Sequence, residues 1–119
     1  MTSRLITTNA IAVGVALVVV PPLPVIAGFY DGNLIFQRCS ESDAANKSLC
    51  LGYIGGIADS MGYSDAKANR SQCVENEATM GQLRDVAVAY LRDNPALRHL
   101  SAAGLIEFAI REVFCSASL

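Results

Sequence analysis

Apolar residues recur with a helical period through most of the chain beyond residue 27, and no strand-like alternation of useful length occurs there. The central segment, Cys50–Asp59, is an apolar helix candidate that begins with a cysteine and contains three glycines. One apolar stripe of this helix is formed by Leu51, Ile54 and Ala58. The pattern predicts that this segment is the central helix of a small bundle.

The glycines of the central helix need an explanation, because each costs about 1 kcal/mol relative to alanine inside a helix. Gly52 and Gly56 lie four residues apart on one face, with Tyr53 and Ile57 flanking them. Since glycine has no Cβ, we expect this strip to allow another helix backbone to approach closely. The partner helix belongs either to the same chain or to a second copy.

Capping residues place the first two helices. Asp31 is the expected N-cap of a short helix that runs to Cys39. The polar segment Ser40–Lys47 is expected to be a loop, and Ser48 is expected to cap the central helix.

The second half of the chain holds the clearest helix signals. The central helix should end near Gly62, and Tyr63–Glu77 should then form a long surface connection. Thr79 has a glutamine three residues later, as in a capping box, and the helix that follows should stop at Asn94–Pro95. Ser101 should cap the last helix. The apolar stripe of the last helix comprises Ala102, Leu105, Ile106, Ala109, Ile110 and Val113.

Four aromatic residues on helical stripes are expected in the core: Tyr53, Tyr90, Phe108 and Phe114. The sequence therefore predicts an all-α bundle of about four helices.

Residues 1–27 have the layout of a secretory signal peptide. Arg4 supplies the basic end, Ala10–Val20 the apolar core, and Val25–Ala27 the short side chains before a cleavage site after Ala27. A membrane anchor is disfavoured, because the apolar core falls short of the roughly 20 residues that span a bilayer. We expect export to the periplasm, no stable membrane anchor after cleavage, and a single domain at residues 28–119.

Four cysteines lie in the exported part: Cys39, Cys50, Cys73 and Cys115. An even number in a small exported domain predicts two disulfides, whereas a zinc site usually needs closely spaced pairs of ligands. Four cysteines allow three pairings. If the helices alternate in direction, Cys39–Cys50 and Cys73–Cys115 are favoured, although the long connection around Cys73 also permits a Cys50–Cys73 bridge.

The charge of the exported part excludes some partners. Only Arg4 of the nine basic residues precedes the cleavage site, and none of the eleven acidic residues does, so the net charge there is about −3. That balance favours neither nucleic acid nor a membrane surface. With 52 % hydrophobic residues in so short a chain, we expect uncovered apolar helix surface and a homodimer.

No constellation of catalytic residues is evident. His99 is the only histidine, and no nucleophile or orienting acid is spaced to act with it. Asp59 is better explained by capping or ion pairing than by general-base catalysis, because no second carboxylate shares its helix face. We expect neither enzymatic activity nor a cofactor.

An ordered set of motifs resembles the Rap/Tai family of immunity proteins. The set comprises Asp31-Gly-Asn-Leu34, Cys39, Cys50–Asp59, Cys73, Gln82-Leu83, Tyr90-Leu91, Asn94-Pro95, Arg98-His99, Ser101-Ala-Ala103 and Phe114-Cys115. The family usually has a proline soon after the third cysteine and another between the last phenylalanine and cysteine. This chain has Cys73-Val-Glu-Asn-Glu77 and Phe114-Cys115 instead.

The resemblance implies an exported, all-α and commonly dimeric protein that binds and blocks a peptidoglycan amidase delivered by type VI secretion. Two connections could enter the amidase cleft, Tyr63–Glu77 and Asp93–Ser101, and the second is favoured because Pro95 and the flanking helices restrain it. Its expected effector-binding residues are Asp93, Asn94, Pro95, Arg98 and His99. The alternative is a structural or ligand-binding helical protein of the cell envelope without a toxin partner.

Overall fold

The computed structural model describes residues 7–18, 28–74 and 78–116. The regular elements are α1 (Gly32–Ser40), α2 (Ala44–Lys67), α3 (Met80–Asp93), the 3₁₀ turn η1 (Pro95–Leu97), α4 (Ala102–Ile110) and the π-helical turn η2 (Arg111–Cys115). The described residues contain no β-strand, only an isolated bridge between Asp31 and Ser101. The predicted all-α bundle is confirmed.

Residues 7–18 precede the bundle without helix or strand, and all of them are exposed. None of the described helices has the length and apolar character needed to cross a membrane. The predicted cleavage site after Ala27 lies outside the described residues.

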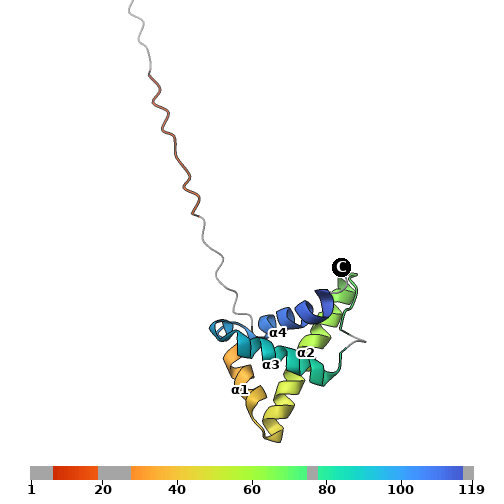
Figure 1. The fold of residues 1–119 in the computed structure, drawn as a ribbon. Helices are drawn as coiled ribbons and strands as arrows, with labels where there is room; N and C mark the ends of the chain where they lie inside the picture. The colour runs from red at the N-terminus through yellow and green to blue at the C-terminus, as the bar shows by residue number, and fades with distance from the viewer. Residues whose placement is uncertain (1–6, 19–27, 75–77, 117–119) are drawn as a thin grey trace, which may run out of the picture.

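Helix α3 lies at the centre of the bundle and packs against α1, α2 and α4 (Figure 1). Helix α2 is the longest of the described helices, with 24 residues, and its C-terminal end lies close to η2 (Figure 1). The fully buried side chains with the largest volumes are Ile35, Ile54, Leu91, Ile106, Ile110 and Cys50. Each of the four helices therefore contributes to one core.

Two of the predicted helix starts are confirmed. The Asp31 carboxylate accepts a hydrogen bond from the backbone N–H of Leu34 at 2.8 Å. Thr79 forms the complete capping box, because its hydroxyl accepts from the Gln82 N–H at 3.2 Å while the Gln82 side chain accepts from the Thr79 N–H at 2.8 Å. These contacts satisfy backbone donors that the first turn of a helix leaves free.

The predicted bounds of the central helix are wrong at both ends. Asp43 is the N-cap, accepting from the Asn46 N–H at 3.0 Å, so Ser48 lies inside α2 and only part of Ser40–Lys47 is a loop. At the other end the helix continues past Gly62 because Met61 and Asp65, one turn apart, are both buried. The connection to α3 is thus shorter than Tyr63–Glu77.

The end of the last helix also departs from the prediction. The stripe from Ala102 to Ile110 is buried as expected, but the side chain of Val113 is 54 % exposed. The π-helical turn η2 changes the helical period after Ile110 and turns Val113 away from the core. Phe108, which was expected in the core, is also exposed.

The favoured cysteine pairing is confirmed. Cys39 is bonded to Cys50 and Cys73 to Cys115, each with a Cα–Cα distance of 5.1 Å. The first bridge joins the end of α1 to the first half of α2, and the second joins the α2–α3 connection to the end of η2. The bridges therefore fasten different ends of the bundle.

Close backbone packing occurs at other glycines than the predicted ones. A Cβ built on Gly52 or Gly56 would meet nothing within 4 Å, so none of the helices that the structure describes packs on that strip. Gly55 faces the Met80 side chain instead, with its would-be Cβ at 3.1 Å from the Met80 Cε. Gly32 is tighter still, because its Cβ would lie 3.0 Å from the Cα and carbonyl oxygen of Arg98.

Alanine substitutions at two glycines should therefore have opposite effects. We expect Gly32→Ala to lower the free energy of unfolding by about 1–3 kcal/mol, because backbone atoms cannot move aside as a flexible side chain does. At protein concentrations low enough to keep the chain monomeric, Gly52→Ala should raise it by up to about 1 kcal/mol through helix propensity alone. Urea unfolding at such concentrations, followed by circular dichroism, measures both changes, and a destabilising Gly52→Ala would show that another part of the same chain packs on this strip.

Candidate functional site

The connection between α3 and α4 is a short, well-held turn. Asn94 ends α3, and its side-chain amide donates to the Tyr90 carbonyl at 2.9 Å. Pro95 opens the 3₁₀ turn, within which the Leu97 N–H donates to the Asn94 carbonyl at 3.0 Å. The chain reversal predicted at Asn94–Pro95 is confirmed.

The beginning of α1 fastens this turn from the other side. The N–H of Gly32 donates to the Leu100 carbonyl at 3.0 Å, and the N–H of Asn33 donates to the Arg98 carbonyl at 2.9 Å. The N–H of Ala102 completes the contact by donating to the Tyr30 carbonyl at 3.0 Å. The absence of a side chain at Gly32 allows the two segments to approach this closely.

The side chain of Arg98 takes part in the same attachment. Its guanidinium carbon lies 4.4 Å from the centroid of the Phe36 ring, on α1, in a cation–π contact. The residue is half-buried, and its Nε atom is buried without a hydrogen-bond partner. Arg98 was predicted as an effector-binding residue, but the structure directs it toward α1, where it holds the turn in place.

The other predicted binding residues divide by exposure. Asp93, Pro95 and His99 are exposed, whereas Asn94 is half-buried by its capping role. Asp93 pairs with the neighbouring Arg92 at 3.0 Å, and the His99 Nδ1 atom lies 2.9 Å from the Ala96 carbonyl oxygen. The turn thus presents a carboxylate, a proline and an imidazole on a fixed backbone.

Leu97 belongs to the same exposed surface, although sequence reasoning did not select it. Its side chain is 37 % exposed at the centre of the turn. Its exposure could be expected from the sequence, because an apolar side chain in a turn of only three residues can bury little of its surface. Exposed apolar side chains on a turn with a well-held backbone suit burial against a partner protein.

The predicted helix-packing residues lie away from this turn. Gly52 and Gly56 are exposed on α2, and Tyr53 is half-buried. The Tyr53 ring packs edge-on against the ring of Tyr30, with 5.5 Å between centroids. Tyr53 therefore supports the segment that leads into α1, and the two glycines remain open.

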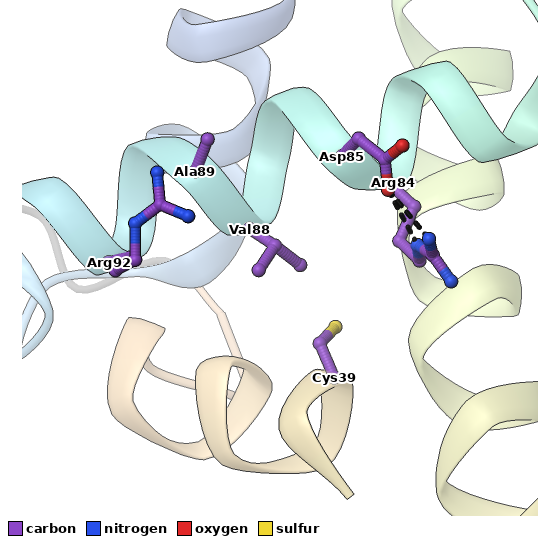
Figure 2. A pocket seen from close by; sticks show the side chains of 6 residues that line it. All are labelled: Cys39, Arg84, Asp85, Val88, Ala89 and Arg92. Carbon is purple, nitrogen blue, oxygen red and sulfur yellow. Dashed lines mark hydrogen bonds and ion pairs between the residues drawn. The ribbon is translucent and has the colours of Figure 1, made fainter. Parts of the chain in front are cut away.

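A hollow of about 350 Å³ lies between α1 and α3 (Figure 2). Its lining residues are Cys39, Arg84, Asp85, Val88, Ala89 and Arg92. Arg84 is bonded to Asp85 at 2.6 Å, and Cys39 is oxidised, so neither offers a free reactive group. The one carboxylate in this lining, Asp85, is paired with Arg84, and the cysteine sulfur there is held in a disulfide.

Metal binding and acid–base catalysis find no support elsewhere in the described residues. No group of three or more His, Cys, Asp or Glu side chains there is placed to hold a metal ion. Asp59, the other candidate base, is exposed on α2. The arrangement favours recognition by surface contact.

The comparisons with known proteins agree with these observations. The family model described as "Rap1a immunity proteins" matches residues 31–115, which include every helix and both disulfides. No curated protein and no solved structure matches the chain significantly. Because the match covers well over half of its length, the chain belongs to the Rap1a immunity proteins, a family whose immunity role implies binding of a secreted effector.

Proposed function

We propose that the protein is exported to the periplasm, where it binds a peptidoglycan amidase delivered by type VI secretion and occludes its active-site cleft. Membership of the Rap1a family supports an immunity role against a secreted effector. The resemblance of the ordered motifs to Rap/Tai proteins supports a peptidoglycan amidase as that effector. The occluding element is the turn from Asp93 to Ser101.

The observation that carries this choice is the attachment of the turn on three sides. Helices α3 and α4 hold its ends, and the hydrogen bonds from Gly32 and Asn33 hold its middle. A loop that is already ordered loses little conformational entropy on binding, so more of its contact energy appears as affinity. Asp93, Pro95, Leu97 and His99 form its accessible surface.

Inhibition of an amidase tests the proposal directly. The probe is a purified cysteine-nucleophile peptidoglycan amidase delivered by type VI secretion, assayed by release of cleaved fragments from peptidoglycan. We expect stoichiometric inhibition by the wild type. An Asp93→Ala/His99→Ala double variant should bind roughly 10- to 100-fold more weakly, since central contacts of an interface commonly contribute 1–3 kcal/mol. Its melting temperature should hardly change, because both side chains are exposed.

Two further variants separate binding from folding. Asp59→Ala with Lys47→Ala, both exposed on α2, serves as the matched control and should inhibit normally. Arg98→Ala should lower the melting temperature, because it removes the contact with Phe36. Full inhibition by a folded Asp93/His99 variant would move the binding surface to the connection around Cys73, and an uninhibited amidase would overturn the function itself.

Export is supported by the cysteine chemistry. Two disulfides persist in an oxidising compartment such as the periplasm and are rare in the cytosol. The layout of residues 1–27 matches a cleaved signal, so the exported form is expected to begin at Gly28.

We also propose a homodimer that uses the exposed face of α2. Leu49, Gly52, Gly56 and Tyr63 follow one another at spacings that place them on one side of the helix, and all four are exposed. The Tyr63 side chain is 70 % exposed. A glycine-bearing helix face allows a second copy to approach closely, and two-fold dimers are the commonest oligomers.

Light scattering at tens of micromolar protein tests the dimer. We expect the mass of two chains for the wild type and of one chain for Gly52→Arg, because an arginine would prevent close approach of the two helices. Gly104→Arg, at an exposed glycine of α4 with open space around it, is the matched control and should remain dimeric. A monomeric wild type would refute the dimer, and a dimeric Gly52→Arg would place it on another surface.

A further inference from the structure

One charged side chain is buried among the residues that the structure describes. Asp65, in the last turn of α2, is 2 % exposed. A buried carboxylate is costly unless it is paired and hydrogen-bonded. The Arg111 guanidinium donates two hydrogen bonds to this carboxylate in a bidentate arrangement, from Nη1 to Oδ2 at 3.2 Å and from Nη2 to Oδ1 at 3.1 Å. Arg70 adds bonds from Nε and Nη2 to the same Oδ1 at 3.2 and 3.0 Å.

This network keeps Asp65 ionised. The hydrogen bonds from Arg111 hold the pKa of the carboxyl below its ordinary value despite the opposing effect of burial, and those from Arg70 act in the same direction. Asp65 also raises the pKa of the Arg111 guanidinium, so both partners stay charged. The charge is therefore available to attract both arginines whenever these segments approach.

The two arginines stand just before the two cysteines of one disulfide. Arg70 precedes Cys73 by three residues, and Arg111 precedes Cys115 by four. Cys73 and Cys115 are bonded across a sequence separation of 42. The Asp65 carboxylate thus binds both segments that carry these cysteines, and the two segments must meet before the disulfide forms. The element η2, which follows α4, lies against the end of α2 at this place (Figure 1).

The two disulfides of the chain differ in how easily their cysteines meet. Cys39 and Cys50 are only 11 residues apart, so they meet by local folding. The wider separation of Cys73 and Cys115 costs more loop-closure entropy, and four thiols allow three pairings. A contact that forms before oxidation raises the effective concentration of the correct pair.

We propose that Asp65 is a positioning residue for the oxidation of Cys73 and Cys115. In the reduced chain it binds Arg70 and Arg111 and brings the two thiols together. One protein thiolate then attacks a small-molecule disulfide such as oxidised glutathione and displaces a glutathione thiolate. The second protein thiolate attacks the protein sulfur of this mixed disulfide and displaces the second glutathione as a thiolate. Two protein thiols lose two electrons and two protons, and one glutathione disulfide becomes two thiols.

Oxidative refolding tests this role. The purified protein is reduced, unfolded in guanidinium chloride and diluted into a glutathione redox buffer. Samples are trapped with a thiol-blocking reagent, and non-reducing peptide mapping follows each bridge. In Asp65→Asn we expect the Cys73–Cys115 bridge to form roughly tenfold more slowly, with mispaired species accumulating, because charged hydrogen bonds to both segments are lost. The Cys39–Cys50 bridge should form at the wild-type rate.

Arg70→Met distinguishes positioning from mere stabilisation. The Arg70 side chain is 60 % exposed, so its loss should change stability little. The proposal nevertheless requires slower formation of the Cys73–Cys115 bridge in this variant. Glu107→Gln is the matched control, because it removes the negative charge that pairs with Arg111 at 2.9 Å and leaves Asp65 untouched.

A destabilised control completes the experiment. Ile110→Val weakens the core beside Arg111 without touching the carboxylate. The proposal is overturned if Asp65→Asn and Arg70→Met pair their cysteines at the wild-type rate. It is equally overturned if Ile110→Val mispairs as much as Asp65→Asn. If Asp65→Asn does not fold, the rate of Cys73–Cys115 bridge formation in Arg70→Met decides between the proposal and its rejection.

Discussion

Replacing Cys73 and Cys115 together with alanine is expected to lower the free energy of unfolding by about 4 kcal/mol. Replacing Cys39 and Cys50 in the same way should cost about 3 kcal/mol. The difference follows from the separations of 42 and 11 residues, because a bridge that closes a longer loop removes more entropy from the unfolded chain. Against a total stability of about 5–15 kcal/mol, either loss is severe.

Urea unfolding of the two double variants, followed by circular dichroism, measures both losses. The Cys73/Cys115 variant should nevertheless keep its helical content, because the ion pairs of Asp65 hold the same end of the bundle. Single alanine variants are unsuitable, since each leaves a free thiol that can pair wrongly. A Cys39/Cys50 variant that lost more stability than the Cys73/Cys115 variant would contradict the loop-entropy account.

The helix ends that the sequence predicts correctly are those determined by neighbouring residues. The caps at Asp31 and Thr79 need only a side chain and a backbone N–H three residues apart, so local reading suffices. The stop at Asn94–Pro95 follows from the geometry of proline. The cysteine pairing also followed, because helices of alternating direction bring the ends of successive helices together.

One error is local, because Asp43 and not Ser48 caps α2, and the others concern contacts between segments distant in sequence. Gly62 suggested the end of α2, but burial of Met61 and Asp65 against the rest of the bundle extends that helix. Asp65 follows Met61 by four residues, about one helical turn, and so lies on the buried stripe of Ile54 and Met61, which marks it as a buried charge. Its partner Arg111 is 46 residues away, and no local pattern connects them.

The candidate site shows the same division. Its position, its restraint by Pro95 and the exposure of Asp93 and His99 follow from the local sequence. The inward direction of Arg98 does not, because it depends on Phe36 in a different helix. The turn is also more rigid than Pro95 alone implies, since α1 donates two hydrogen bonds to it.

Truncating Ile54 to alanine is expected to destabilise the protein by about 3–4 kcal/mol. The Ile54 side chain is fully buried near the middle of α2 and forms part of the common core. Its truncation removes apolar contacts and leaves a cavity that surrounding side chains fill only in part. Ile57 is the matched control, because it is the same residue type on the same helix and only partly buried against that core.

Ile57→Ala should cost about half as much as Ile54→Ala, since less apolar surface returns to water when a half-buried side chain is truncated. Urea unfolding of both variants gives the two losses, and an unchanged slope with urea shows that the unfolded states are comparable. Equal losses at the two positions would mean that the exposed side of Ile57 is covered in solution. Because Ile57 lies one residue from Gly56, that result would point to a second copy packed on the glycine-bearing face of α2.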